Sequence, residues 1–197
     1  ELSDFIDFSS NEIISTNKYL KKIIFSDSQL KKILFNLFIK EKLYKKITNL
    51  TGFNYSIDFL IAYKTLPILD NEKSKGWYAN KLHNDKPFTK NTLKIIIPLE
   101  NIEKENGPME ILNKNESTNF NENNFYSSYS HFIGTPKDIF IFKPNLCLHR
   151  AGIPDKNKYR KQIMLQLNPS SKWLFNKSIY KFQKIREPKF PFISYFF

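Results

Sequence analysis

The residues with the clearest chemical potential stand close together in the chain: His83 and Asp85. Residues i and i+2 of an extended segment point to the same side, so this imidazole and this carboxylate can face one point. Such a pair can provide two ligands of a divalent metal site, which then needs a further ligand from elsewhere in the chain. A His-x-Asp pair also arises by chance, so the pair alone is weak support for a metal site.

Two later residues, His149 and Arg160, strengthen this interpretation. Adding His149 gives two imidazoles and one carboxylate, a ligand set that leaves metal positions open and suits non-haem Fe(II). Arg160 is one of only three arginines among 31 basic residues. Its guanidinium is a planar, permanently charged fork for a carboxylate, which lysine cannot reproduce. Arg160 is therefore a candidate anion-binding residue.

The composition restricts the class of protein. The chain has 197 residues, of which 41% are hydrophobic and 16% aromatic, which suits one globular domain and excludes a disordered chain. No apolar run is long enough for a membrane span. The lone Cys147 excludes a disulfide framework and a Cys-rich zinc module, and the acidic first residues do not resemble a signal peptide. We therefore expect a cytoplasmic protein.

The formal net charge of +12 has two interpretations. Abundant lysine with scarce alanine and glycine is typical of an AT-rich gene, so the charge can be drift on a solvated surface. A basic surface also attracts anions, including nucleic acid or an anionic small molecule. No basic run, zinc finger or aromatic RNA-binding motif accompanies the charge, so nucleic-acid binding is the less favoured function.

Apolar spacing predicts helices in the first part of the chain. A helical stripe runs from Asp27 to Leu50, with Asp27 or Ser28 as its cap and Gly52 as its end. Its lysine-rich face is that of a solvated packing helix rather than of a membrane-surface helix. We expect a second helix over residues 11–25.

After Gly52 the pattern changes to short β-branched and alternating runs, which predict strands. The predicted strands cover residues 55–63, 92–99, 109–112, 138–142, 147–150 and 160–167. The Asn106-Gly107-Pro108 turn suggests that strands 92–99 and 109–112 are neighbours. Short loops and the lack of a helical pattern from about 92 to 168 favour an antiparallel sandwich or barrel. The polar segment 113–130 is expected to be a loop over a site, and the aromatic segment 173–197 to pack on the core or on a partner subunit.

Several stretches, taken in order, carry a resemblance to a known family: W-Y-A-N-K-L-H-N-D (77–85), T-L-K-I-I-I-P-L-E (92–100), E-N-G-P-M-E-I-L (105–112), K-D-I-F-I-F (137–142), L-H-R-A-G (148–152) and then Arg160. Together they resemble the Fe(II)/2-oxoglutarate-dependent oxygenases, and within these the phytanoyl-CoA dioxygenase group. The resemblance covers about half of the chain. It implies a mainly β fold, a double-stranded β-helix (jelly-roll, cupin-like) with flanking helices. We expect a single domain over 1–197, with a helical part (1–52), a jelly-roll core (53–170) and an aromatic extension (171–197).

The resemblance also implies roles for individual residues. His83, Asp85 and His149 would bind Fe(II), and Arg160 would pair with the distal carboxylate of the cosubstrate 2-oxoglutarate. Family members use O2 to oxidise a substrate C–H bond, commonly to an alcohol, while 2-oxoglutarate becomes succinate and CO2. Halogenating relatives lack the carboxylate ligand, so Asp85 favours hydroxylation or a related oxidation. Three residues on predicted strands are further candidates for the cosubstrate pocket, with a structural role as the alternative: Thr92, Lys94 and Gln162.

Other features leave the substrate open. Where the family usually shows Pro-Gly-Ser-His, this chain has Asn113 to Ser117, and Lys137 replaces a usual glycine. The substrate is expected to be a small molecule, which the basic charge allows to be anionic. Two rival functions remain: a jelly-roll binding module without activity, and a nucleic-acid protein. For five residues a structural role is expected to be more frequent than a functional one: Tyr63, Trp77, His131, Cys147 and Arg150.

Overall fold

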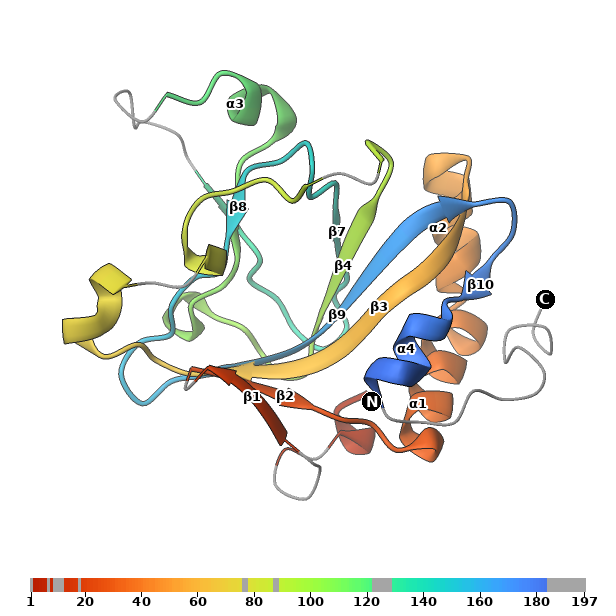
Figure 1. Cartoon of the computed structure of the whole chain (residues 1–197), viewed down its shortest axis with the longest axis horizontal. Helices are drawn as coiled ribbons and strands as arrows, with labels where there is room; N and C mark the ends of the chain where they lie inside the picture. The colour runs from red at the N-terminus through yellow and green to blue at the C-terminus, as the bar shows by residue number, and fades with distance from the viewer. Residues whose placement is uncertain are drawn as a thin grey trace.

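Two β-sheets form the centre of the molecule (Figure 1). The structure is a computed structural model that describes residues 2–6, 8, 13–17, 19–75, 78–86, 89–121 and 129–183. The larger sheet has the order β1 (Ile13–Asn17), β2 (Leu20–Ile23), β3 (Asn54–Thr65), β9 (Arg160–Ser170), β4 (Leu93–Pro98) and β7 (Phe140–Phe142). These strands pair antiparallel, and β10 (Leu174–Phe175) adds to β3 in parallel. The smaller antiparallel sheet has the order β6 (Ser130–His131), β5 (Glu110–Ile111) and β8 (His149–Arg150).

The two faces of the larger sheet have different partners. On β9, Ile163, Leu165 and Leu167 are fully buried and belong to the main hydrophobic core. Helical segments cover this face: α1 (Asp27–Leu34), the π-helix η2 (Phe35–Lys40), α2 (Leu43–Thr51) and α4 (Lys177–Phe182) (Figure 1). Because side chains alternate along a strand, the even-numbered residues of β9 point to the other face.

A second, smaller hydrophobic cluster joins the two sheets. It contains Ile96 and Phe142 from the larger sheet and Ile111 from the smaller one, together with Met109. The register pairs Ile96 with Met164 and Lys94 with Gln166, so all of these side chains share the face opposite the main core. The even-numbered side chains of β9, from Arg160 onward, therefore lie on the face that meets the smaller sheet.

The helical region follows the prediction with one interruption. Ser26, rather than Asp27 or Ser28, caps α1 in a reciprocal capping box with Gln29. The expected continuous helix breaks before α2, where Lys42 takes a left-handed backbone with φ of 52°. Gly52 ends α2 as predicted, with φ of 76°, a conformation that glycine adopts at little cost.

The predicted helix over 11–25 is wrong. Residues 13–17 and 20–23 form the hairpin β1–β2, and β2 pairs with the second half of β3. The segment contains β-branched Ile13, Ile14 and Thr16, and Ile23 becomes fully buried in the main core. An open edge of β3 therefore decides the structure of a segment whose own pattern is ambiguous.

The predicted pairing of strands 92–99 and 109–112 is also wrong, because β4 and β5 lie in different sheets. The chain crosses between the sheets through the 3₁₀ helix η5 (Lys104–Asn106) and Gly107, which has φ of 62°. A side chain at Gly107 would lie 2.3 Å from the backbone carbon of Ile153, so only glycine allows this approach. The crossing brings residues 106–107 against the segment that follows β8.

The remaining segments are short. The polar segment contains the helix α3 (Lys114–Thr118), and residues 122–128 lie outside the described part of the chain. Trp173, Phe175 and Ile179 are buried in the main core, while residues 184–197 are outside the described part. Further 3₁₀ helices are η1 (Leu2–Phe5), η3 (Asp70–Lys75) and η4 (Tyr78–Asn80). Among the described residues, no helix combines the length and the apolar character that a membrane crossing requires.

Candidate functional site

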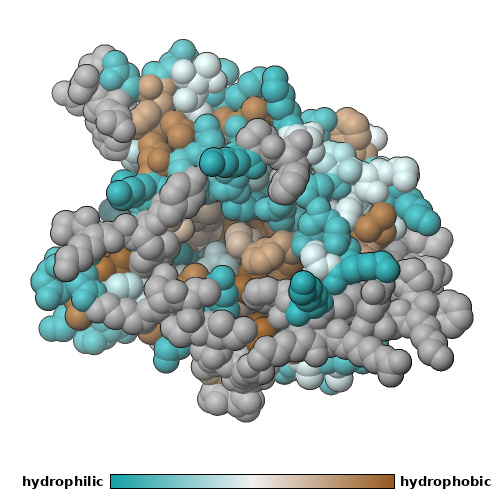
Figure 2. Space-filling view, in the orientation of Figure 1, coloured by the Kyte–Doolittle hydropathy of each residue, from teal (hydrophilic) through white to brown (hydrophobic). Residues whose placement is uncertain are grey.

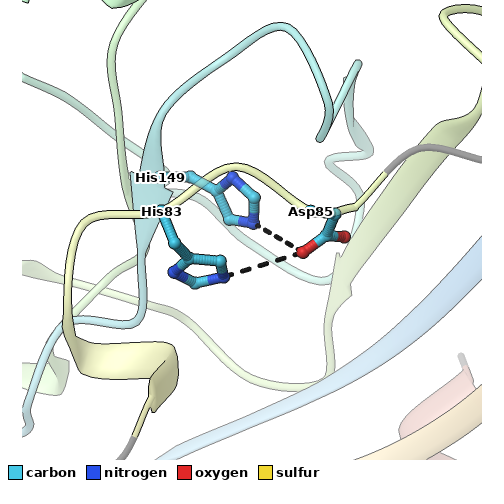
Figure 3. A group of neighbouring side chains, drawn as sticks. All are labelled: His83, Asp85 and His149. Carbon is cyan, nitrogen blue, oxygen red and sulfur yellow. Dashed lines mark ion pairs between the residues drawn. The ribbon is translucent and has the colours of Figure 1, made fainter.

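His83, Asp85 and His149 converge on one point between the two sheets (Figure 3). Asp85 Oδ1 lies 3.6 Å from His83 Nε2 and 3.7 Å from His149 Nε2. The three ligand atoms all lie within 4.8 Å of one another. The distances from Oδ1 exceed those of a hydrogen bond and are close to the separation of two ligands on one ion, about 3.0–3.4 Å for bonds near 2.1 Å. The arrangement can hold a divalent metal.

The backbone fixes the two histidines against each other. His83 N–H donates to the His149 carbonyl at 3.1 Å, and His149 N–H donates back to the His83 carbonyl at 3.0 Å. The segment before His83 also lies alongside the segment after His149, since the Ala151 N–H donates to the Ala79 carbonyl at 2.6 Å. Residues far apart in sequence are thus held side by side by the main chain rather than by their own side chains.

Each imidazole is oriented through its Nδ1 atom. His83 Nδ1 lies 2.7 Å from the Lys81 carbonyl, and His149 Nδ1 lies 2.9 Å from the Cys147 carbonyl. A carbonyl oxygen only accepts, so Nδ1 carries the proton in both rings and Nε2 presents its lone pair to the common point. A second hydrogen bond of this kind is what orients histidine ligands in metal sites.

His149 is kept neutral by its surroundings. It is 3% exposed and packs edge-on against Phe142, with ring centroids 5.1 Å apart. Burial lowers the pKa of His149 to about 4, and the positive charge of Lys94 acts in the same direction. Neutral imidazole is the form that binds a metal, so His149 is ready to serve as a ligand at neutral pH.

The carboxylate of Asp85 pairs with Lys94, for which the sequence analysis expected a different role. Lys94 Nζ lies 2.5 Å from Asp85 Oδ2, and both side chains are largely buried. The Asp85 N–H donates to the Pro144 carbonyl at 3.0 Å, which fixes the backbone of this loop residue. Lys94 was predicted as a residue of the cosubstrate pocket, and the structure places its ammonium directly against the Asp85 carboxylate.

Arg160 is buried without an acidic partner among the described residues. It is 1% exposed, and its Nη1 donates to the carbonyls of Asn106 at 3.4 Å and Gly152 at 3.3 Å. Its Nε has no hydrogen-bond partner in the described part of the chain. Burial lowers the pKa of Arg160, yet a guanidinium stays charged in proteins. A buried cation with a free donor fits an anionic ligand.

Tight glycine packing supports this guanidinium. A side chain at Gly152 would lie 2.2 Å from the Pro108 carbonyl oxygen, and Gly107 lies in the same contact. The two segments that supply the carbonyl acceptors of Arg160 therefore meet backbone to backbone. Since Gly152 follows His149 by three residues, this contact links the arginine to the strand that carries a metal-ligand candidate.

Two side chains on β3 lie next to Arg160 and were not predicted as binding residues from their sequence alone. The register pairs Thr65 with Arg160 and Tyr63 with Gln162. Gln162 Nε2 donates to the Tyr63 hydroxyl, and the Thr65 hydroxyl is buried without a partner among the described residues. Burial raises the pKa of Tyr63, so its hydroxyl keeps its proton. Side chains alternate between the two faces of β3, so Tyr63 and Thr65 lie on one face, and pairing of this strand with β9 places that face beside Arg160. This alternation is the signal in the sequence that could have identified the two residues.

Thr92 lies away from this group. Its hydroxyl donates to Asn168 Oδ1 at 2.7 Å. Asn168 lies near the C-terminal end of β9, whereas Arg160 is the first residue of that strand. Eight residues of extended strand separate Asn168 from Arg160, which corresponds to about 26 Å. The structure thus brings Gln162 to Arg160 and Lys94 to Asp85, but gives Thr92 a partner in another polar cluster.

The residues expected to be structural also have clear positions. Arg150 pairs with Glu110 on the neighbouring strand, with Nη2 2.6 Å from Oε2. Cys147 packs against the cluster between the sheets, and burial raises the pKa of its thiol. His131 is exposed on β6. Trp77 lies outside the described residues.

One face of the molecule is hollowed near its middle (Figure 2). Figure 2 shows a hollow near the middle of this face, with apolar atoms inside it and hydrophilic residues along parts of its rim. Figure 1 places β8 on one side of this position and β3 and β9 on the other.

Comparison with known proteins gives likeness of fold only. No family model matches the sequence, and no curated protein matches it. Solved structures do match. SnoN, a non-haem α-ketoglutarate-dependent epimerase from nogalamycin biosynthesis, is 14% identical with a TM-score of 0.58, over 83% of this chain and 68% of that one. It has also been solved with Fe3+, α-ketoglutarate and nogalamycin RO.

Two further structures show the same fold. HygX from Streptomyces hygroscopicus, solved with nickel, 2-oxoglutarate and hygromycin B, is 10% identical with a TM-score of 0.51, over 83% of this chain and 75% of that one. SnoK, a non-haem α-ketoglutarate-dependent carbocyclase, is 13% identical with a TM-score of 0.50, over 83% of this chain and 70% of that one. The chain shares the fold of non-haem α-ketoglutarate-dependent enzymes that catalyse different reactions.

Proposed function

We propose that this protein is an Fe(II)- and 2-oxoglutarate-dependent oxygenase built on a double-stranded β-helix, related to the phytanoyl-CoA dioxygenase group. Its expected reaction is oxidation of a C–H bond in a small molecule, with an alcohol, succinate and CO2 as products. The observation that carries the proposal is the convergence of two imidazoles and one carboxylate on a common point. This set of donors fits Fe(II) and leaves positions open for other ligands.

The chain's own residues would divide the work as follows. His83, Asp85 and His149 would hold the metal, and their backbone bridge would keep the two Nε2 atoms aimed at it. Arg160 would take the distal carboxylate of 2-oxoglutarate, because its buried Nε lacks a partner among the described residues. Tyr63 can donate its proton to the same carboxylate while it accepts a hydrogen bond from Gln162. When bound, Fe(II) and 2-oxoglutarate supply the activation of O2 that no side chain can provide.

A small-molecule substrate is supported by the hollow beside the site and by the fold neighbours. Hygromycin B and nogalamycin RO are ligands of those neighbours. Hydroxylation is favoured by the presence of Asp85, while the epimerase and the carbocyclase show that the fold also serves other reactions.

Metal and cosubstrate binding by the purified chain tests the proposal. We expect calorimetry to show Mn2+ binding, and 2-oxoglutarate binding that depends on Mn2+. The variant His83→Ala should lose both, whereas His131→Ala, which removes an exposed histidine outside the site, should keep both. Succinate formation under O2 with Fe(II) would then establish turnover. Wild-type protein that binds neither Mn2+ nor 2-oxoglutarate would overturn the proposal.

A further inference from the structure

The carboxylate of Asp85 uses its two oxygens differently. Oδ1 faces His83 Nε2 and His149 Nε2, whereas Oδ2 forms the 2.5 Å ion pair with Lys94 Nζ. Lys94 sits inside the larger sheet, where β4 pairs with β9 on one side and β7 on the other. Strand pairing on both sides holds its backbone in place, and its side chain is only 15% exposed. The ammonium is directed at Asp85 by the sheet itself.

This contact decides how Asp85 can bind a metal. A carboxylate can bind an ion through one oxygen or through both. Binding through both would require Oδ2 to leave an ammonium group that has little access to water. With Lys94 in place, Asp85 offers one oxygen, and one more position on the metal stays available to other ligands.

The same contact sets the charge of the site. The ammonium of Lys94 lies directly against the Asp85 carboxylate, so the positive charge of the one balances the negative charge of the other. A divalent ion bound there keeps nearly its full positive charge, because its only anionic ligand is already shared with a cation. Such a site binds a metal less tightly than an unpaired carboxylate would, but attracts a doubly negative chelating ligand more strongly.

We infer that Lys94 is a positioning residue that holds Asp85 through its Oδ2 atom. It lowers the affinity of the site for the metal, but it keeps one more metal position open and the bound metal strongly positive, which favours binding of the anionic cosubstrate. This inference rests on the proposed function, since it concerns the same metal site. It assigns Lys94 a role through Asp85 and not through direct contact with 2-oxoglutarate.

Two binding measurements on the full chain separate this role from a merely structural one. Mn2+ affinity is measured first, and 2-oxoglutarate affinity is then measured at saturating Mn2+. For Lys94→Met, which keeps much of the side-chain volume but removes the charge, we expect equal or tighter Mn2+ binding and roughly tenfold weaker 2-oxoglutarate binding. Lys94→Arg, which keeps the charge and the donors, should restore 2-oxoglutarate affinity to near that of wild type.

Lys161→Met is the matched control. Lys161 also lies on a strand of the larger sheet and pairs with an acid, Glu100, at 3.4 Å, but it points to the other face. Losing this charge should change neither affinity. If Lys94→Met weakens Mn2+ binding, or if it leaves 2-oxoglutarate affinity at the wild-type value, the inference is wrong while the proposed function stands. Failure of the wild-type protein to bind Mn2+ would overturn both.

Discussion

Two polar clusters of this molecule, one around Asp58 and one around Arg160, differ in how completely their groups are paired. Asp58 Oδ1 accepts from Ser56 Oγ at 2.5 Å and from Asn176 Nδ2 at 3.0 Å, and Oδ2 accepts from Asn168 Nδ2. The Asp58 carbonyl accepts from Ser178 Oγ at 3.0 Å. Arg160, by contrast, has a buried Nε without a partner, and the neighbouring Thr65 hydroxyl also has none in the described part of the chain.

The difference indicates what each cluster is for. The Asp58 cluster joins the irregular point of β3 to β9 and to the start of α4, and the chain itself supplies the donors for both carboxylate oxygens. A fully paired network stabilises the fold. An unpaired buried group costs free energy, so a ligand that supplies the missing partner gains binding free energy there.

Arg160→Met is expected to have the largest effect, and in opposite directions on two properties. The affinity for 2-oxoglutarate should fall roughly a thousandfold, because a buried charged partner of the ligand is removed. The free energy of unfolding should rise by about 1–3 kcal/mol, because an uncompensated buried charge is replaced by an apolar side chain. Calorimetry and urea unfolding of the metal-free protein measure the two effects.

Arg150→Met provides the comparison, since Arg150 has Glu110 as a partner. It should lower stability slightly and leave 2-oxoglutarate affinity unchanged. A clear loss of stability in Arg160→Met would show that Arg160 belongs to the fold rather than to a binding site.

The pH dependence of stability is the next test. The unfolded chain takes up a proton at His149 near pH 6.5, whereas the folded protein resists protonation until about pH 4. The contribution of His149 is therefore present above pH 6.5 and is lost as the pH falls, by about 3 kcal/mol across this window. Urea unfolding of metal-free wild type and His149→Gln at each pH isolates the effect. A difference between the two proteins that stays constant from pH 7 to pH 4 would contradict it.

Asp58→Ala should lower the free energy of unfolding by about 2 kcal/mol, since it leaves the amides of Asn168 and Asn176 without their acceptor. Mn2+ and 2-oxoglutarate affinities should stay at wild-type values. Asp58→Asn, which keeps one acceptor oxygen, should cost less. Loss of Mn2+ binding in folded Asp58→Ala would mean that the two clusters are not independent.

Thr92→Val has the smallest expected effect. It removes the hydrogen bond to Asn168, at a cost of about 1 kcal/mol in unfolding free energy. The affinity for 2-oxoglutarate should not change, because Thr92 lies at the Asn168 end of β9. A weakened 2-oxoglutarate affinity in this variant would instead support the role in the cosubstrate pocket that the sequence alone allowed.

The sequence predicted the strands best where alternation is strong. In residues 160–167, the buried Ile163, Leu165 and Leu167 alternate with Gln162, Met164 and Gln166, and β9 covers that whole run. The sequence also singled out His83, Asp85 and His149, because the chain has only three histidines and the order of the surrounding motifs is informative. Their convergence comes from two backbone bridges that no local pattern contains.

What the sequence did not predict depends on contacts between distant segments. The β1–β2 hairpin forms because β3 offers an edge, and the crossing from β4 to β5 depends on the close contact at Gly107. The Lys94–Asp85 ion pair follows from the register of β4 in the sheet, which places one lysine among many beside a single acid. Pairing partners of this kind become visible only when the fold is known.

The backbone contact between Gly107 and Gly152 has a consequence for engineering the protein. Any library that varies the walls of the hollow to accept new molecules should leave these two positions untouched. Even alanine there would push apart the segments that support Arg160. Substitutions elsewhere in the protein can be explored more widely, because they leave this backbone contact between two distant segments intact.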